Sequence, residues 1–78
     1  MIAKAEIEDR ALVIGTRGVA RMLGVSQRHV ERLDASQLMP RPVWIGRAKR
    51  WKLRDIREWL DLDCPDRATW ESRQRSNS

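Results

Sequence analysis

The sequence contains no phenylalanine and no tyrosine, and it has only one cysteine and one histidine among 78 residues. Cys64 lies 35 positions after His29, so the chain lacks the cysteine and histidine spacing of a zinc site. A single cysteine cannot form a disulfide within the chain, which fits a reducing cytoplasm. The chain also lacks a glycine-rich phosphate loop and a histidine beside a nucleophile. The sequence therefore predicts no enzyme, and it predicts no metal, no cofactor and no small-molecule substrate.

Long hydrophobic runs are missing as well. The longest run near the amino terminus is Ala-Leu-Val-Ile at residues 11–14, which is too short for a signal peptide or a membrane span. We expect this run to be a short extended lead-in after a flexible, charged leader over residues 1–10. The length allows one small domain, which we place at residues 11–62. A short helical turn and a frayed tail are expected over residues 63–78, and the expected location is cytoplasmic, without a membrane partner.

Residues 16–33 have the pattern of two short helices joined by a tight turn. Thr16 carries a hydroxyl that can cap the first helix. The apolar face of this helix is formed by Val19, Ala20 and Leu23. Gly24 stands where a helix ends in the left-handed conformation, and Ser26 can cap the next helix. This order is typical of a helix-turn-helix, whose second helix enters the major groove of DNA.

The second helix has distinct inward and outward sides. At about 100° per residue, Val30 and Leu33 point inward, with Gln37 between them if the helix runs that far. The residues that point outward are Arg28, Glu31 and Arg32, with Gln27 and His29 on the flanks. The candidate DNA-contact residues are therefore Ser26, Gln27, Arg28, His29 and Arg32. The alternative is that the two arginines are ordinary solvated charges.

A β-hairpin is predicted after the proline-containing segment 38–42, which cannot continue a helix. We expect the turn at residues 46–48, between a strand that starts at Val43 and a strand that ends at Trp51. The side chains expected to face the helices are Val43, Ile45 and Trp51, with Trp44 on the outward face. The predicted fold is mainly α with this small hairpin, which is the arrangement of a winged helix-turn-helix.

A third helix is predicted over residues 52–60, and its apolar side consists of Leu53, Ile56, Trp59 and Leu60. Because four tryptophans are the only aromatic residues, we expect Trp51 and Trp59 to anchor the core. Met22 and Met39 are expected to fill gaps in that core. Near the carboxyl terminus, residues 63–71 can form a final helical turn with Pro65 at its first position and Trp70 docked on the body.

The basic residues are concentrated in one part of the chain. Residues 1–34 carry six basic and five acidic side chains, residues 35–57 carry seven and one, and residues 58–78 carry three and five. The corresponding net charges are +1, +6 and −2, which sum to the total of +5. A basic excess confined to the hairpin and the start of the third helix is expected for contact with a phosphate backbone. The alternative is a surface made soluble by lysine and arginine.

Several of these segments together resemble the AlpA-like and excisionase-like winged helix-turn-helix proteins, which are relatives of the MerR DNA-binding domain. The resemblance covers residues 12–60 and is carried by Leu-Gly-Val-Ser at 23–26, Leu-Met-Pro-Arg-Pro-Val at 38–43, Ile-Gly at 45–46 and Arg-Trp at 50–51. It implies a prophage or mobile-element protein of the bacterial nucleoid that binds specific double-stranded DNA. Its implied role is transcriptional activation or the direction of excision by a recombinase.

The resemblance also implies contacts and partners. Recognition-helix contacts fall on Ser26, Gln27, Arg28, His29 and Arg32, and wing contacts fall on Arg47, Lys49 and Arg50. The implied partners are DNA, a recombinase, and a second copy of the chain on an adjacent DNA site. Gly18 departs from a position that is often acidic in the family, and Lys49 departs from a position that is commonly apolar. The long dimerisation coiled coil of MerR-type regulators is missing.

Two other functions remain open on the sequence alone. Small terminase subunits can carry a similar winged fold, so the chain could be the DNA-recognition module of a phage packaging enzyme. The chain could also be a protein-interaction adaptor that keeps the fold without binding DNA. The DNA sequence of the target, the oligomeric state and the role of Cys64 do not follow from the sequence.

Overall fold

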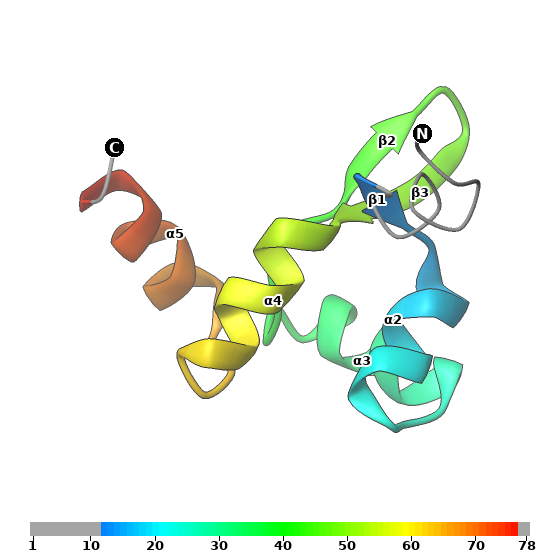
Figure 1. Cartoon of the computed structure of the whole chain (residues 1–78), viewed down its shortest axis with the longest axis horizontal. Helices are drawn as coiled ribbons and strands as arrows, with labels where there is room; N and C mark the ends of the chain where they lie inside the picture. The colour runs from blue at the N-terminus through cyan, green and yellow to red at the C-terminus, as the bar shows by residue number, and fades with distance from the viewer. Residues whose placement is uncertain (1–11, 77–78) are drawn as a thin grey trace, which may run out of the picture.

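The computed structural model describes residues 12–76, and the predicted leader over residues 1–10 lies outside them. The elements, in chain order, are β1 (Val13–Ile14), α2 (Thr16–Leu23), α3 (Gln27–Ala35), β2 (Val43–Ile45), β3 (Ala48–Lys52), α4 (Leu53–Asp61) and α5 (Arg67–Ser76). The described chain is thus mainly helical, with four helices and a small antiparallel sheet (Figure 1). None of the helices between residues 12 and 76 is long and apolar enough to cross a membrane.

The sheet has three strands in the order β1-β3-β2, and β3 is its central strand. The lead-in is extended, as predicted, and it pairs with β3 so that Ile14 lies opposite Trp51. The backbone N–H of Leu53 donates to the carbonyl of Leu12 (2.9 Å), which continues this pairing into the start of α4. The lead-in therefore adds a third strand to the predicted hairpin and places α2 beside the sheet.

The register of the hairpin differs from the prediction by one residue. Ile45 lies opposite Ala48, so the turn contains two residues, and Ala48 belongs to the strand rather than to the turn. Gly46, with φ 64°, is the first of the two turn residues, a position that favours glycine. A shift of one residue exchanges the two faces of a strand. The prediction that Val43, Ile45 and Trp51 share the inward face is therefore wrong.

The faces of the hairpin follow from this register. Trp44 lies opposite Lys49 and shares its face with the core residue Trp51, yet its own side chain remains 62% exposed. Ile45 lies on the other face and is 56% exposed. The prediction that Trp44 lies on the face away from Trp51 is thus wrong, although its side chain is exposed, and the burial expected for Ile45 is not found.

The turn between α2 and α3 forms as its sequence predicts. Gly24 adopts the left-handed conformation at φ 70°, and the N–H of Val25 donates to the carbonyl of Ala20 (3.0 Å). Ser26 caps α3, because its Oγ accepts a hydrogen bond from the backbone N–H of His29 (3.0 Å). The cap predicted for Thr16 is wrong: α2 begins one residue earlier than expected, with Gly15 at the capping position and no side-chain cap.

We expect Gly24→Ala to lower the free energy of unfolding by about 1 kcal/mol. No heavy atom outside the two adjoining residues lies within 4 Å of the added methyl group, so the cost comes from the left-handed backbone alone. Gly24→Asn is the matched control, because asparagine tolerates this conformation better than alanine. Urea unfolding of the two variants measures the effect, and an equal loss for both would contradict this explanation.

The hydrophobic core lies between the sheet and the helices. It consists of Val19, Ala20, Val30, Met39, Trp51, Ile56, Trp59 and Trp70. The predictions for Trp51, Trp59 and Met39 are confirmed, but Met22 is 40% exposed because it lies on the outer side of α2. Leu60 likewise lies at the surface of α4.

The carboxyl end of α3 departs from the prediction for Gln37. The helix ends at Ala35, and Gln37 is exposed, with φ 57° in the left-handed region. The N–H of Leu38 donates to the carbonyl of Leu33 (2.8 Å), which closes the end of the helix and turns the chain toward β2. Gln37 therefore does not continue the inward stripe of Val30 and Leu33.

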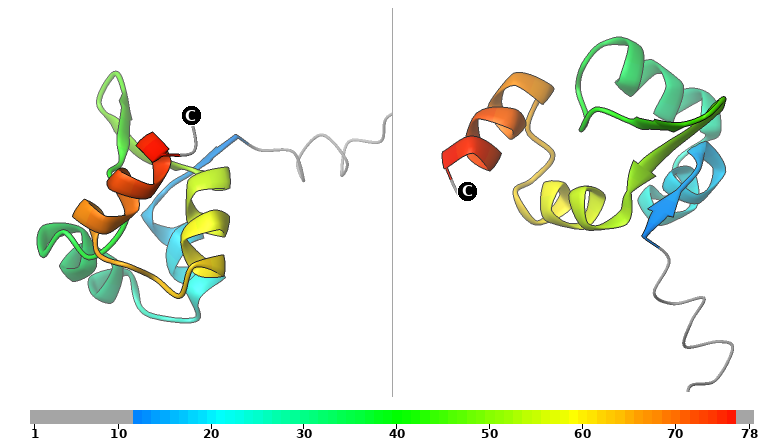
Figure 2. Two further views of the ribbon diagram at one scale, coloured as in Figure 1. Left: turned by 90° about the vertical axis from the view of Figure 1, so that its left-hand side faces the viewer. Right: turned by 90° about the horizontal axis from the view of Figure 1, so that it is seen from above.

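The carboxyl-terminal segment is a ten-residue helix rather than the single turn that the sequence predicts. Helix α5 runs from Arg67 to Ser76, so residues 72–76 are helical and not frayed. Asp66 precedes it, and hydrogen bonding with Thr69, first from its side chain and then from its backbone N–H (3.1 Å to Oδ1), lowers the pKa of this carboxyl below its ordinary value. Trp70 is buried, as predicted, and Figures 1 and 2 show α5 at one end of the molecule.

Candidate nucleic-acid interface

Helix α3 presents its first turn and its outer face to solvent. The exposed residues there include the predicted contact residues Ser26, Gln27, Arg28, His29 and Arg32. Apart from the cap at Ser26, none of their side chains forms a hydrogen bond or an ion pair with residues 12–76. The opposite side of the helix is held by Val30, which is fully buried in the core. All five predicted residues are therefore exposed on α3 or at its cap, and Arg28 and Arg32 lie on the outward surface of the helix, away from Val30.

The three predicted hairpin contacts do not form such a set. Arg47 is exposed in the turn and has no ion pair or hydrogen bond within the described chain. Lys49 points inward, toward α3, and its Nζ forms an ion pair with Asp34 and lies 5.3 Å from the Trp51 ring. Arg50 is half-buried, and its Nη1 donates to the carbonyl of Lys49 (2.8 Å). Only Arg47 is therefore placed as a free cation for a phosphate.

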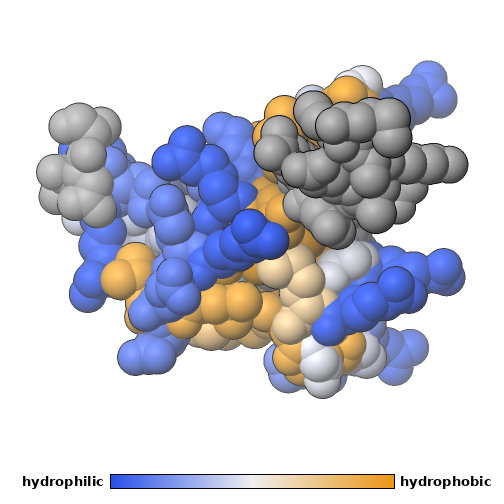
Figure 3. All heavy atoms as spheres, viewed as in Figure 1, coloured by the Kyte–Doolittle hydropathy of each residue, from blue (hydrophilic) through white to orange (hydrophobic). Residues whose placement is uncertain are grey.

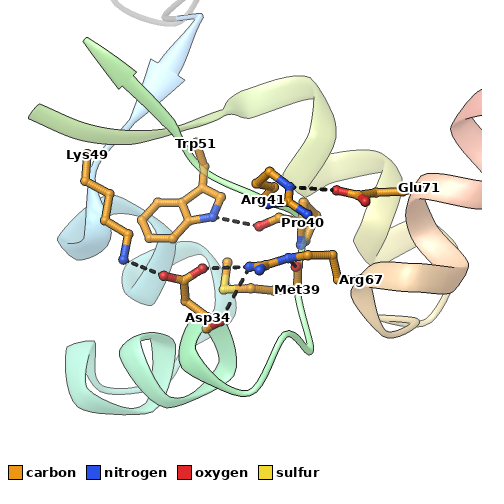
Figure 4. Close-up of polar contacts among 8 residues, drawn as sticks. All are labelled: Asp34, Met39, Pro40, Arg41, Lys49, Trp51, Arg67 and Glu71. Atoms are coloured by element: carbon orange, nitrogen blue, oxygen red, sulfur yellow. Dashed lines mark hydrogen bonds and ion pairs between the residues drawn. The ribbon is translucent and has the colours of Figure 1, made fainter. Parts of the chain in front are cut away.

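Lys49 is part of a polar cluster that the sequence does not predict. We call it the Asp34 cluster, and its members are Asp34, Lys49 and Arg67 (Figure 4). One carboxylate oxygen of Asp34 pairs with Lys49, and the other accepts a hydrogen bond from Nη2 of Arg67 (2.7 Å). The Nε of Arg67 donates to the carbonyl of Met39 (3.0 Å). The cluster therefore links α3, β3, α5 and the segment between α3 and β2.

A surface cavity of about 370 Å³ lies beside this cluster. Its lining residues are Asp34, Arg41, Pro42, Trp44, Lys49 and Arg67. The cations on this wall are largely committed, because Arg41 pairs with Glu71 (3.0 Å) while the other two pair with Asp34. The cavity is thus the open side of a salt-bridge network rather than part of the outward surface of α3.

Ion pairs within the chain neutralise part of the positive charge of the basic segment 35–57. Three of its seven cations form ion pairs: Lys49 with Asp34, Arg41 with Glu71, and Arg54 with Glu58. The other four cations of this segment, which form no ion pair within residues 12–76, are Arg47, Arg50, Lys52 and Arg57. Of these, Arg47 in the turn and Lys52 at the end of β3 are exposed on the hairpin. On the face drawn in Figure 3, hydrophilic side chains gather over α5 and at the edge near α2, and an apolar strip follows α4.

Other kinds of site receive little support from the described residues. Between residues 12 and 76, no group of three or more histidine, cysteine, aspartate and glutamate side chains could hold a metal ion. Cys64 is exposed, and partial desolvation, followed by the charge of Asp63, raises the pKa of its thiol above the ordinary value. A raised pKa disfavours the thiolate, which is the nucleophilic form of cysteine.

Comparison with known protein-family models and with curated proteins gave no match for this chain. The interpretation of the interface therefore depends on the residues and the geometry described above.

Proposed function

We propose that this chain binds specific double-stranded DNA as a winged helix-turn-helix protein. In this proposal α2 and α3 are the two helices of the motif, α3 enters the major groove, and the β2–β3 hairpin is the wing. The observation that carries the proposal is the outward surface of α3. Polar side chains without partners in the described chain stand on the first turn of a capped helix whose other side is fixed in the core.

The side chains of this surface suit the edges of DNA bases. Arg28 can make a bidentate contact with O6 and N7 of guanine, and Gln27 can make one with N6 and N7 of adenine. The amino terminus of α3 also carries the positive end of the helix dipole, which favours a nearby phosphate. In this proposal Arg28 and its neighbours read the sequence, and the wing holds the duplex.

The biological role rests on the resemblance to AlpA-like and excisionase-like proteins. We propose a small regulator of a phage or mobile element, acting in the bacterial nucleoid as a transcriptional activator or as an excision factor. A recombinase or a second copy on adjacent DNA is its further partner. A DNA-recognition role in phage packaging is the second candidate, and a DNA-independent adaptor is the third. Selection of bound fragments from a genomic library separates the adaptor from the two DNA-binding roles, because an adaptor enriches no sequence. The gene neighbourhood separates the regulator from the packaging module.

Arg47→Ala is expected to weaken binding to all DNA sequences alike. If Arg47 contacts one phosphate, the slope of log K against log salt becomes shallower by about 0.9. Lys49→Ala is the matched control, because Lys49 pairs with Asp34 and does not face a phosphate in this proposal. Its salt slope should equal that of the wild type. Titrations at four salt concentrations measure both slopes, and an unchanged slope for Arg47→Ala removes this residue from the interface.

A further inference from the structure

Arg67 is the one charged side chain that is buried in the described part of the chain, with 8% of its surface exposed. It is the first residue of α5, and its hydrogen bonds reach three residues at the end of α3 and in the segment that follows it. Its Nε donates to the carbonyl of Met39 (3.0 Å), its backbone N–H donates to the carbonyl of Gln37 (3.0 Å), and its Nη2 donates to Oδ1 of Asp34 (2.7 Å). A buried guanidinium with this many partners is held in one place.

Asp34 lies in the last turn of α3 and receives a cation from each side. Arg67 of α5 binds one of its carboxylate oxygens, and Lys49 of β3 binds the other (Figure 4). The carboxylate is itself largely buried, so solvent screens these pairs less than it screens surface pairs. One side chain of α3 is therefore connected to both the hairpin and the carboxyl-terminal helix.

The backbone packing of α3 makes this connection important. Helix α3 packs chiefly on α2, and it has little direct packing against β2 or β3. Helix α5 is likewise attached mainly through its side chains, above all Trp70 and Arg67. Two connections therefore join α3 to the hairpin: one runs through α2, which packs on β3, and the other is the Asp34 cluster.

We propose that Arg67 is a positioning residue for DNA discrimination: through Asp34 and Lys49 it fixes the orientation of α3 relative to the hairpin. The inference rests on the proposed function, because α3 and the hairpin are there the reading helix and the wing. A rigid link of this kind keeps the side chains of α3 aligned with the DNA bases while the wing contacts the DNA phosphate backbone. Arg67 touches no DNA in this arrangement.

The first experiment measures the geometry without DNA. Spin labels are attached at Glu31→Cys on α3 and Arg47→Cys in the hairpin turn, in a Cys64→Ser background, and the distance distribution between them is recorded. Arg67→Met is expected to broaden this distribution, and Arg67→Lys should restore part of the native width because it keeps the charge opposite Asp34. Glu71→Gln is the matched control, because it breaks another ion pair of α5, the one between Glu71 and Arg41. The side chains of Arg41 and Glu71 are 67% and 35% exposed.

The second experiment measures discrimination with unlabelled protein. Arg67→Met should reduce the ratio of affinities for the selected site and for unrelated DNA by roughly 3- to 30-fold. Its salt slope should stay unchanged, because no phosphate contact is lost. Asp34→Asn nearly preserves the shape of the side chain but removes its charge, so it weakens the same link at α3. It should also reduce the ratio of affinities for the selected site and for unrelated DNA. Both variants are measured at a temperature at which tryptophan fluorescence reports the native state.

The outcomes separate this inference from the proposed function. A native distance distribution in Arg67→Met overturns the positioning role, whether or not the protein binds DNA. A salt slope shallower by about 0.9 overturns it too, because Arg67 then contacts a phosphate itself. If the wild-type chain prefers no DNA sequence, the proposed function fails and the role in discrimination falls with it. Broadening together with reduced discrimination supports the inference.

Discussion

Replacing Trp59 with alanine is expected to lower the free energy of unfolding by about 3–5 kcal/mol. The side chain is 2% exposed in the core, and its Nε1 donates to the carbonyl of Pro65 (2.7 Å). The substitution therefore leaves a large cavity and a carbonyl without its donor. Because small domains have a total stability of about 5–15 kcal/mol, the expected loss is a large part of it. Urea unfolding followed by circular dichroism measures the change.

Trp44→Ala is the matched control for this prediction. Trp44 is 62% exposed on the hairpin, so its removal should change the free energy of unfolding by about 0.5 kcal/mol or less. The same residue type is thus expected to have very different effects at two positions. A loss below about 1 kcal/mol for Trp59→Ala would contradict the packing of α4 against the core.

Arg28→Ala is expected to weaken binding to the preferred DNA site by about 1–3 kcal/mol and to relax discrimination at one base position. The reason is that Arg28 lies exposed in the first turn of α3, on the side away from the buried Val30. Its guanidinium has no ion pair in the described chain, so no internal contact is broken. A competition titration against single-base variants of the selected site measures both effects.

Arg21→Ala on α2 serves as the control for Arg28. Arg21 is an exposed arginine of the neighbouring helix and is not among the predicted base contacts. Its removal should affect all single-base variants equally. If Arg28→Ala also loses affinity equally for every variant, Arg28 holds a phosphate, and the reading role passes to Gln27, His29 or Arg32.

Local chemistry explains which structural features could be predicted from the sequence. Gly24 and Ser26 form the predicted turn because their effects act over a few neighbouring residues. Trp51 and Trp59 form the core because few other large apolar side chains are available. The outward surface of α3 follows from helical periodicity, which needs no tertiary information.

The hairpin shows how a small local error changes the predicted faces of a strand. Placing three residues in the turn instead of two reverses the faces of β2 relative to Trp51 on β3, and with them the positions assigned to Trp44 and Ile45. Because Gly46 suits turns of either length, the sequence did not distinguish them. Lys49 shares the face of Trp51 in either register, so its prediction as a DNA contact came from the resemblance rather than from the turn. The side chain pairs with Asp34 instead.

The Asp34 cluster could not be predicted from local patterns. Asp34 and Arg67 are 33 positions apart, and each resembles an ordinary surface charge in the sequence. The available signal was weak: Arg67 lies three residues before the docked Trp70 and therefore on nearly the same face of α5. Such a pattern indicates a buried position but does not identify its partner.

The central claim is that α3 reads a DNA sequence, and the most direct test compares the affinities of the wild-type chain for two DNA duplexes. One duplex carries the site selected from a random pool, and the other has the same base composition in scrambled order. At physiological salt, this account predicts that the selected site binds about a thousandfold more tightly or better. Equal affinities for the two duplexes would contradict the account and favour the DNA-independent adaptor.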